Sequence, residues 1–92
     1  MKKKRHIPII SFNELELKQK KRQVYNSLVE GISEAFKNNS SEIKLCEVKY
    51  ANTYLTVHKD SWSESLAKAM DFYIEKEEYE MCSQIKILLK QL

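Results

Sequence analysis

The chain contains a single glycine and a single proline, Gly31 and Pro8, in 92 residues. Tight turns and irregular loops depend on these two residue types, so their scarcity favours regular secondary structure joined by short connections. It also excludes a glycine-rich phosphate-binding loop, a collagen-like repeat and a long flexible linker. A chain of this length forms one small domain with a modest core, for which docking on a partner or a second copy would add stability.

The charges are concentrated at one end of the sequence. Residues 1–22 carry eight Lys or Arg against two Glu, a net charge of +6, whereas residues 23–92 carry eight Lys against eleven acids, a net charge of −3. Such a basic head suits contacts with nucleic acid, docking on an acidic protein surface, or a solvated chain end. We interpret residues 1–10 as a basic, partly disordered or extended arm and residues 11–92 as a single domain.

The sequence lacks the patterns of a membrane protein, a metal site or an enzyme. No apolar run approaches the roughly 18 residues that span a bilayer, so we expect a soluble, cytoplasmic protein without a membrane partner. Cys46 and Cys82 form no C-x-x-C pair, and together with His6 and His58 they lack the short spacing of zinc ligands. Because no triad, carboxylate pair or phosphate loop is present either, we expect neither catalysis nor a cofactor.

The first half of the chain predicts one long helix. Ser11 and Glu14 have the spacing of a capping box, and apolar residues then recur at steps of three and four, which predicts a helix over residues 12–37. The polar run at residues 18–23 should project from the core as a solvated turn or contact a partner. The Asn- and Ser-rich residues 38–41 form a stop signal.

Two strands are predicted next, over residues 42–50 and 53–59, where β-branched and aromatic residues are frequent. Asn52 can adopt the left-handed conformation of a tight turn between them. The alternation of apolar residues in the first strand is imperfect, so either both faces are partly covered or a bulge intervenes. Because an isolated hairpin is marginal in water, it must lie on helices, pair with another chain, or add the apolar segment around Ile9 as a third strand.

Two further helices are predicted over residues 62–75 and 78–91. Ser61 and Glu64 repeat the capping-box spacing before the first of them, and Asp60 is a second candidate cap. The apolar faces of these two segments would lie on opposite sides of one straight helix, so a corner is expected at the polar residues 75–78. The predicted class is therefore α+β, with an N-terminal helix, a short antiparallel β-hairpin and a C-terminal αα-hairpin.

The last third of the chain resembles a known motif. The residues that carry the resemblance are Leu66, Met70, Glu78-Tyr79-Glu80, Cys82-Ser83, Ile85, Lys86, Leu89 and Leu92. They are similar to the UVR motif, a short helical hairpin found in excision-nuclease subunits and in some bacterial stress adaptors. The sequence departs from the motif at Tyr73, where a small residue is usual, and at Lys86-Ile87. The resemblance implies a protein–protein docking hairpin without catalysis.

We therefore predict an adaptor that docks a protein partner through its C-terminal helical hairpin. The aromatic candidates for that contact are Trp62, Phe72, Tyr73 and Tyr79. The small size and Lys-rich, Gly-poor composition would also suit a phage or mobile-element accessory protein.

Two alternatives remain open. The first is a nucleic-acid-binding accessory protein, in which a sheet face with a tyrosine beside Lys44 or Lys49 could stack bases. Its candidate contacts are Lys2, Lys3, Lys4, Arg5, Lys18, Lys20, Lys21, Arg22, Tyr50 and Tyr54. The second alternative is a small structural subunit that self-associates through a sheet edge or through the helical hairpin.

Overall fold

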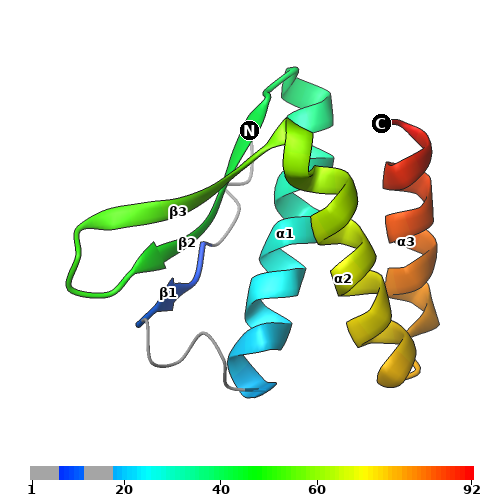
Figure 1. Cartoon of the computed structure of the whole chain (residues 1–92), viewed down its shortest axis with the longest axis horizontal. Helices are drawn as coiled ribbons and strands as arrows, with labels where there is room; N and C mark the ends of the chain where they lie inside the picture. Colours follow the sequence, from blue (N-terminus) through cyan, green and yellow to red (C-terminus); the bar gives the residue numbers. More distant parts are fainter. Residues whose placement is uncertain (1–6, 12–17) are drawn as a thin grey trace, which may run out of the picture.

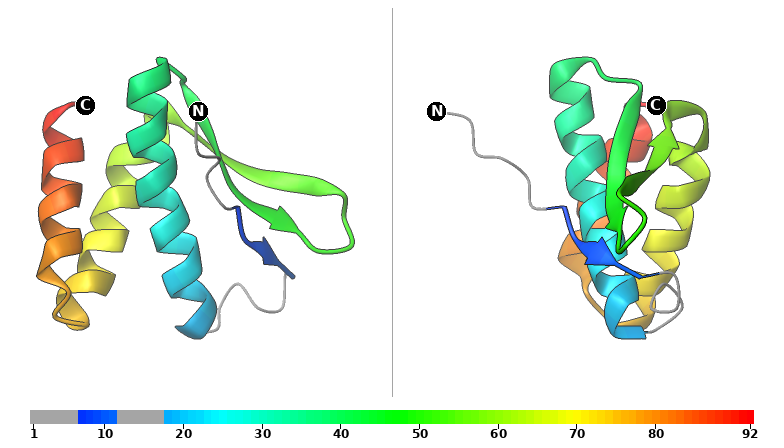
Figure 2. Two further views of the ribbon diagram at one scale, coloured as in Figure 1. Left: turned by 180° about the vertical axis from the view of Figure 1, so that it is seen from behind. Right: turned by 90° about the vertical axis from the view of Figure 1, so that its left-hand side faces the viewer.

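The computed structural model describes residues 7–11 and 18–92, with the side chains of residues 18 and 19 excepted. The elements in chain order are β1 (Ile9–Ile10), α1 (Lys18–Asn38), β2 (Glu42–Val48), β3 (Thr53–His58), the short 3₁₀ helix η2 (Lys59–Ser61), α2 (Trp62–Glu75) and α3 (Tyr79–Lys90). The predicted α+β class is confirmed. The helices lie on one side of the sheet, and the β2–β3 hairpin projects away from them (Figure 1, Figure 2).

The sheet has the strand order β1-β2-β3. β1 runs parallel to β2, with Ile9 opposite Glu47, so the apolar end of the expected arm is part of the sheet. Parallel neighbours require a long crossover connection, and α1 lies within this one. β3 then returns antiparallel to β2, which leaves β2 in the centre.

A β-bulge explains the imperfect alternation of β2. The register shifts between Lys44 and Cys46, so Leu45 is the extra residue of that strand. Ile43, Cys46 and Val48 are all buried, although a regular strand would place Ile43 on the face opposite the other two. The bulge predicted as one of two explanations is confirmed, and it turns the apolar side chains of β2 toward one side.

The turn between β2 and β3 contains two residues with a left-handed backbone. Asn52 has φ 53°, as its residue type predicts, and Tyr50 has φ 68°. Asparagine tolerates this conformation because its side chain is short and polar, whereas the bulkier tyrosine does not. Residue type alone does not predict this conformation for Tyr50.

Within the described residues, α1 begins at Lys18. The predicted helix start at residue 12 and the carboxylate of the first capping box, at Glu14, lie outside the described residues. Residues 18–23, predicted to project as a solvated turn or to contact a partner, form the first turns of α1, and Arg22 among them pairs with Glu78 elsewhere in the chain. The helix ends as predicted, with Asn39 left-handed at φ 56°.

The second predicted capping box is wrong. Ser61 precedes α2 but has the near-helical angles φ −102° and ψ −1°, and its side chain makes no capping hydrogen bond. The physical reason is η2, which already turns the chain at Lys59 and leaves Ser61 without the extended backbone that a cap requires. Instead, Nδ1 of His58 accepts a hydrogen bond from the Asp60 amide at 3.3 Å.

The corner between α2 and α3 has the hydrogen bonds of a Schellman motif. The Glu78 amide donates to the Tyr73 carbonyl at 2.9 Å, and the Glu77 amide donates to the Ile74 carbonyl at 3.0 Å. Glu77 itself has φ 59°, in the position where helices usually have glycine. A chain so poor in glycine therefore makes this corner with a residue that is less suited to it.

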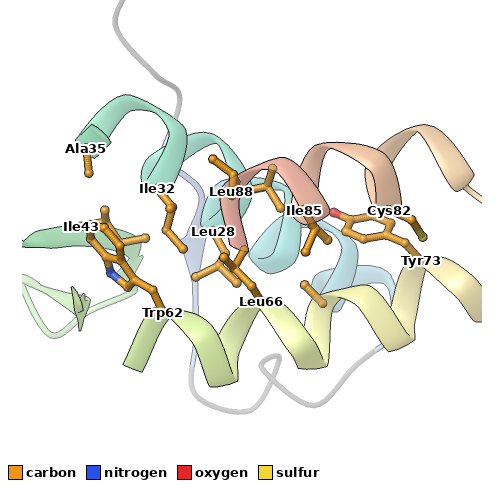
Figure 3. Packing of buried hydrophobic residues seen from close by; sticks show 12 residues of the cluster. Leu28, Ile32, Ala35, Ile43, Trp62, Leu66, Tyr73, Cys82, Ile85 and Leu88 are labelled. Carbon is orange, nitrogen blue, oxygen red and sulfur yellow. The ribbon is translucent and has the colours of Figure 1, made fainter. Parts of the chain in front are cut away.

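The main core lies between the three helices and the inner face of the sheet. α1 packs on β2 and on both C-terminal helices, so it forms the centre of the molecule. The cluster of buried residues is made by Leu28, Val29, Ile32, Ala35, Ile43, Trp62, Leu66, Ala69, Tyr73, Cys82, Ile85 and Leu88 (Figure 3). Every helix contributes one apolar stripe to it, as the helical periodicity requires.

Candidate binding surfaces

Trp62, a predicted docking residue, lies in the core. Its side chain is fully buried, and its ring packs edge to face on Phe36 with centroids 5.7 Å apart. The indole Nε1 donates a hydrogen bond to the Val57 carbonyl at 3.0 Å. An indole that is buried and already has its acceptor is not available to a partner, so this prediction is corrected: Trp62 joins β3 to α2.

Tyr73, another predicted docking residue, is fully buried as well. Its hydroxyl donates to Oδ1 of Asn26 on α1. Burial raises the pKa of the Tyr73 hydroxyl, and the nearby Glu78 carboxylate raises it further. The role of Tyr73 as a partner contact is therefore corrected too, because its ring fills the core and its one polar atom is satisfied inside the protein.

Phe72 is half-buried in a group of side chains that we name the α1–corner cluster. Its ring lies 5.1 Å from Tyr25 and 5.2 Å from Tyr73, measured between centroids. Two cations also lie over it, with Arg22 Cζ at 5.6 Å and Lys76 Nζ at 5.8 Å from the centroid. The cluster consists of Arg22, Tyr25, Asn26, Phe72, Tyr73, Lys76 and Glu78. Phe72 thus contacts neighbours within the chain on several sides, which leaves less of it for a partner.

An ion pair closes this cluster. Nη1 of Arg22 donates to Oε1 of Glu78 at 2.6 Å, from the first turns of α1 to the corner between α2 and α3. The hydrogen bond from Arg22 lowers the pKa of the Glu78 carboxyl, and the same bond raises the pKa of Arg22. Arg22, predicted as a nucleic-acid contact, therefore has a structural partner.

The outward face of α3 carries two exposed apolar side chains. Tyr79 is 61% exposed and Ile87 is 59% exposed, whereas Cys82, Ile85 and Leu88 are buried on the opposite side of the helix. At about 100° per residue, Tyr79 and Ile87 point only about 80° apart, with Ser83 between them. Ile87 was missed as a site residue, although its helical position opposite the core stripe could have identified it.

The outer face of the β2–β3 hairpin carries two lysine–tyrosine pairs. Lys44 Nζ lies 4.6 Å from the ring centroid of Tyr54, which is 41% exposed. Lys49 Nζ lies 5.2 Å from the ring centroid of Tyr50 at the turn. Helices cover only the other face of the sheet (Figure 2), and both tyrosines are exposed. The two tyrosines predicted as base-stacking residues therefore lie on one hairpin, each beside a lysine.

Of the basic residues of the predicted nucleic-acid surface, the structure describes the side chains of Lys20, Lys21 and Arg22. Lys20 and Lys21 are half-buried on α1, and Arg22 is engaged by Glu78. The remaining ones, Lys2, Lys3, Lys4, Arg5 and the side chain of Lys18, lie outside the described part of the chain. The two aromatic residues of that predicted site thus lie on the hairpin, and its three described basic side chains lie on α1.

The residues considered for chemistry lie apart from one another. Cys46 is buried in the sheet and Cys82 on α3, and burial raises the pKa of Cys46. His58 is exposed. In the described ranges, no three His, Cys, Asp or Glu side chains are grouped so that they could hold a metal ion. A buried thiol with a raised pKa is a poor nucleophile, so Cys46 is not a candidate nucleophile, and Cys82 is covered by the core.

A groove of about 510 Å³ lies between β1 and α1, lined by Pro8, Ile9, Gln23, Asn26, Ser27 and Glu30. Two of its polar side chains are already engaged. The Ser27 hydroxyl donates to the Leu45 carbonyl at 2.6 Å, and Asn26 accepts from Tyr73. These bonds hold α1 against β2 and α2, so this part of the groove lining has a structural role.

Comparisons with known proteins give no relative for this chain. No family model, no curated protein and no solved structure matches it. Among the described residues, no helix is both long and apolar enough to cross a membrane. Function must therefore be argued from the exposed surfaces themselves.

Proposed function

We propose that this chain is a non-enzymatic adaptor that docks a protein partner on the outward face of α3. The observation that supports this is the exposure of Tyr79 and Ile87 on the side of α3 that faces away from the core. Of the four aromatic residues predicted to dock, only Tyr79 remains well exposed. This surface belongs to the segment that resembles the UVR motif, which implies protein docking.

Two large apolar side chains on the outer side of a helix do little for the stability of the free protein. Their burial against a partner would be favourable by about 25 cal/mol for each Å² of apolar surface removed from water. Tyrosine is also among the residues that most often dominate binding energies, because it combines a large ring with a polar end. Lys86 and Lys90 are exposed on the same helix and would form a polar rim.

The test is affinity capture from the native host with wild-type protein, the double variant Tyr79→Ala/Ile87→Glu and the control Gln84→Ala. Gln84 is exposed on α3 but lies away from the line between Tyr79 and Ile87. We expect wild type and control to retain the same partner and the double variant to lose it, while far-ultraviolet circular dichroism shows all three folded. The same partners bound to the double variant would refute docking on this face.

The second candidate function is nucleic-acid binding, favoured by the two lysine–tyrosine pairs of the hairpin. An exposed aromatic ring offers a stacking surface, and a neighbouring ammonium offers a phosphate contact. The expected signature is an affinity that falls steeply as salt rises, because each phosphate contact releases counterions. Absence of binding to any oligonucleotide at low salt would remove this candidate and leave the first one unaffected.

A further inference from the structure

Tyr50 combines two unfavourable features at the tip of the hairpin. Its backbone is left-handed, at φ 68°, a conformation that crowds the Cβ of any residue except glycine. Its side chain is 94% exposed, so the ring gains almost nothing from packing inside the protein. The hairpin projects away from the helices, so its turn lies at an outlying point of the molecule (Figure 1). The free fold gains little from a tyrosine in this position, and disfavoured backbone of this kind is often found at functional sites.

The same hairpin repeats the arrangement a short distance along the chain. At the tip, Lys49 Nζ covers the ring of Tyr50, and on the outer face Lys44 Nζ covers the ring of Tyr54. Both lysines are exposed and have long flexible side chains. Each pair therefore places a positive charge beside an aromatic face: Lys44 and Tyr54 lie on the two neighbouring strands, and Lys49 and Tyr50 follow one another in the turn.

We infer that this hairpin binds single-stranded nucleic acid, with bases stacked on Tyr50 and Tyr54 and the neighbouring phosphates paired with Lys49 and Lys44. A base displaces the ammonium from each ring, and the displaced ammonium moves to the adjacent phosphate. This inference rests on the second candidate function and adds to it the form of the nucleic acid that the two pairs bind. Single strands fit because their bases are free to stack on a protein ring, whereas those of a duplex are stacked on each other.

The charges favour a weak, sequence-tolerant contact. Glu42 and Glu47 offset Lys44 and Lys49, so the strands and the turn have no net charge of their own. The positive excess lies in residues 1–22, and its first four basic residues precede β1, the strand that pairs with β2. Stacking on a ring face does not distinguish one base from another, so no strong sequence preference is expected.

The experiment compares wild type with Tyr50→Asn, using a fluorescently labelled 20-nucleotide oligothymidylate in low salt. Asparagine accepts the left-handed backbone but has no ring, so we expect the thermal midpoint to rise while the affinity falls roughly tenfold, the usual effect of one lost stacking contact. Tyr50→Phe should bind as wild type does. Asn52→Gly changes the same turn without removing a ring, and Tyr79→Ala removes an exposed ring elsewhere, so both should leave the affinity unchanged.

The salt dependence tests the lysines. We expect Lys49→Gln and Lys44→Gln each to reduce the slope of log affinity against log salt by about 0.7, the contribution of one phosphate on a single strand. If wild type binds no oligonucleotide at low salt, both the second candidate function and this inference fall. If wild type binds but Tyr50→Asn binds equally well, or if a duplex binds as tightly as the single strand, nucleic-acid binding stands and the inference about the hairpin is overturned.

Discussion

The phenol of Tyr73 is a polar group placed inside a hydrophobic core, where its hydroxyl donates to Asn26 on α1. Replacing Tyr73 with Phe keeps the ring and removes this bond. We expect Tyr73→Phe to lower the free energy of unfolding by about 1 kcal/mol, the usual net value of one hydrogen bond. Urea denaturation checks this value. An unchanged midpoint would mean that the bond does not hold α1 to α2.

The same hydroxyl makes stability depend on pH in alkaline solution. Burial raises the pKa of Tyr73 in the folded protein, whereas in the unfolded chain it lies at about 10. The unfolded chain therefore releases this proton first, and the stabilisation, fully present below about pH 10, is lost as the pH rises beyond it. Thermal midpoints measured above pH 10 should fall more steeply for wild type than for Tyr73→Phe. Parallel curves would contradict the assignment.

At the scale of elements, the corner between α2 and α3 is the connection whose backbone fits its residue least well. Glu77 has a left-handed backbone in the position where glycine is preferred. We expect Glu77→Gly to raise the free energy of unfolding by about 1 kcal/mol, since glycine lacks the Cβ that is crowded there. The control is Ala67→Gly, which should be destabilising by a similar amount because Ala67 is exposed in the interior of α2. Chemical denaturation measures the free energy of unfolding, which should rise for Glu77→Gly and fall for the control.

The Arg22–Glu78 ion pair links α1 to the same corner and should give the protein an acid-sensitive contact. The bond from Arg22 lowers the pKa of Glu78 in the folded state, so its stabilisation is present above the unfolded value of about 4.3 and is lost as the pH falls through the folded pKa. Arg22→Met should remove this part of the acid dependence of the thermal midpoint. Both side chains are partly exposed, so the effect should shrink in high salt.

The control for this ion pair is Lys68→Met, which removes the cation of the exposed Glu64–Lys68 pair on α2. The decrease of its thermal midpoint at acid pH should resemble that of wild type. An identical change in both variants would show that general charge, and not the link between α1 and the corner, determines the acid dependence.

Elements whose signals are local could be predicted from the sequence. The stop of α1 at Asn39 and the left-handed turn residue Asn52 follow from the chemistry of asparagine, and both are observed. The capping box at Ser61 failed because η2, which begins just before it, changed the backbone that the pattern assumes. A spacing rule of this kind holds only where the preceding residues are extended.

The candidate surfaces were harder to predict because exposure depends on the whole molecule. Trp62 and Tyr73 were chosen as docking residues for their aromatic character, yet both lie on the helix face that packs against α1. Tyr79 lies on the other side of its helix and is exposed. The sequence pattern identifies an apolar stripe, but which aromatic residues other elements will cover is decided by long-range packing.

At the scale of the whole molecule, the two buried thiols report whether the sheet and the helices unfold together. Cys46 lies in β2 and Cys82 in α3. Trp62 ties β3 to α2, and α1 packs on both β2 and α3, so we expect one cooperative unit. Both cysteines should then react with a thiol reagent at the same slow rate under native conditions, as followed by mass spectrometry. Faster labelling of Cys46 would show that the sheet opens separately.

The parallel pairing of β1 with β2 also sets an order of assembly. Residue 9 faces residue 47 across the ladder, so β1 leaves the ribosome before its partner strand and stays unpaired until α1 and most of β2 have been synthesised. Closing so long a stretch of chain is entropically costly, whereas the β2–β3 hairpin and the α2–α3 pair form between neighbours. β1, which is made before β2 and β3, should therefore settle after them, and it completes a sheet that the two later strands have already begun.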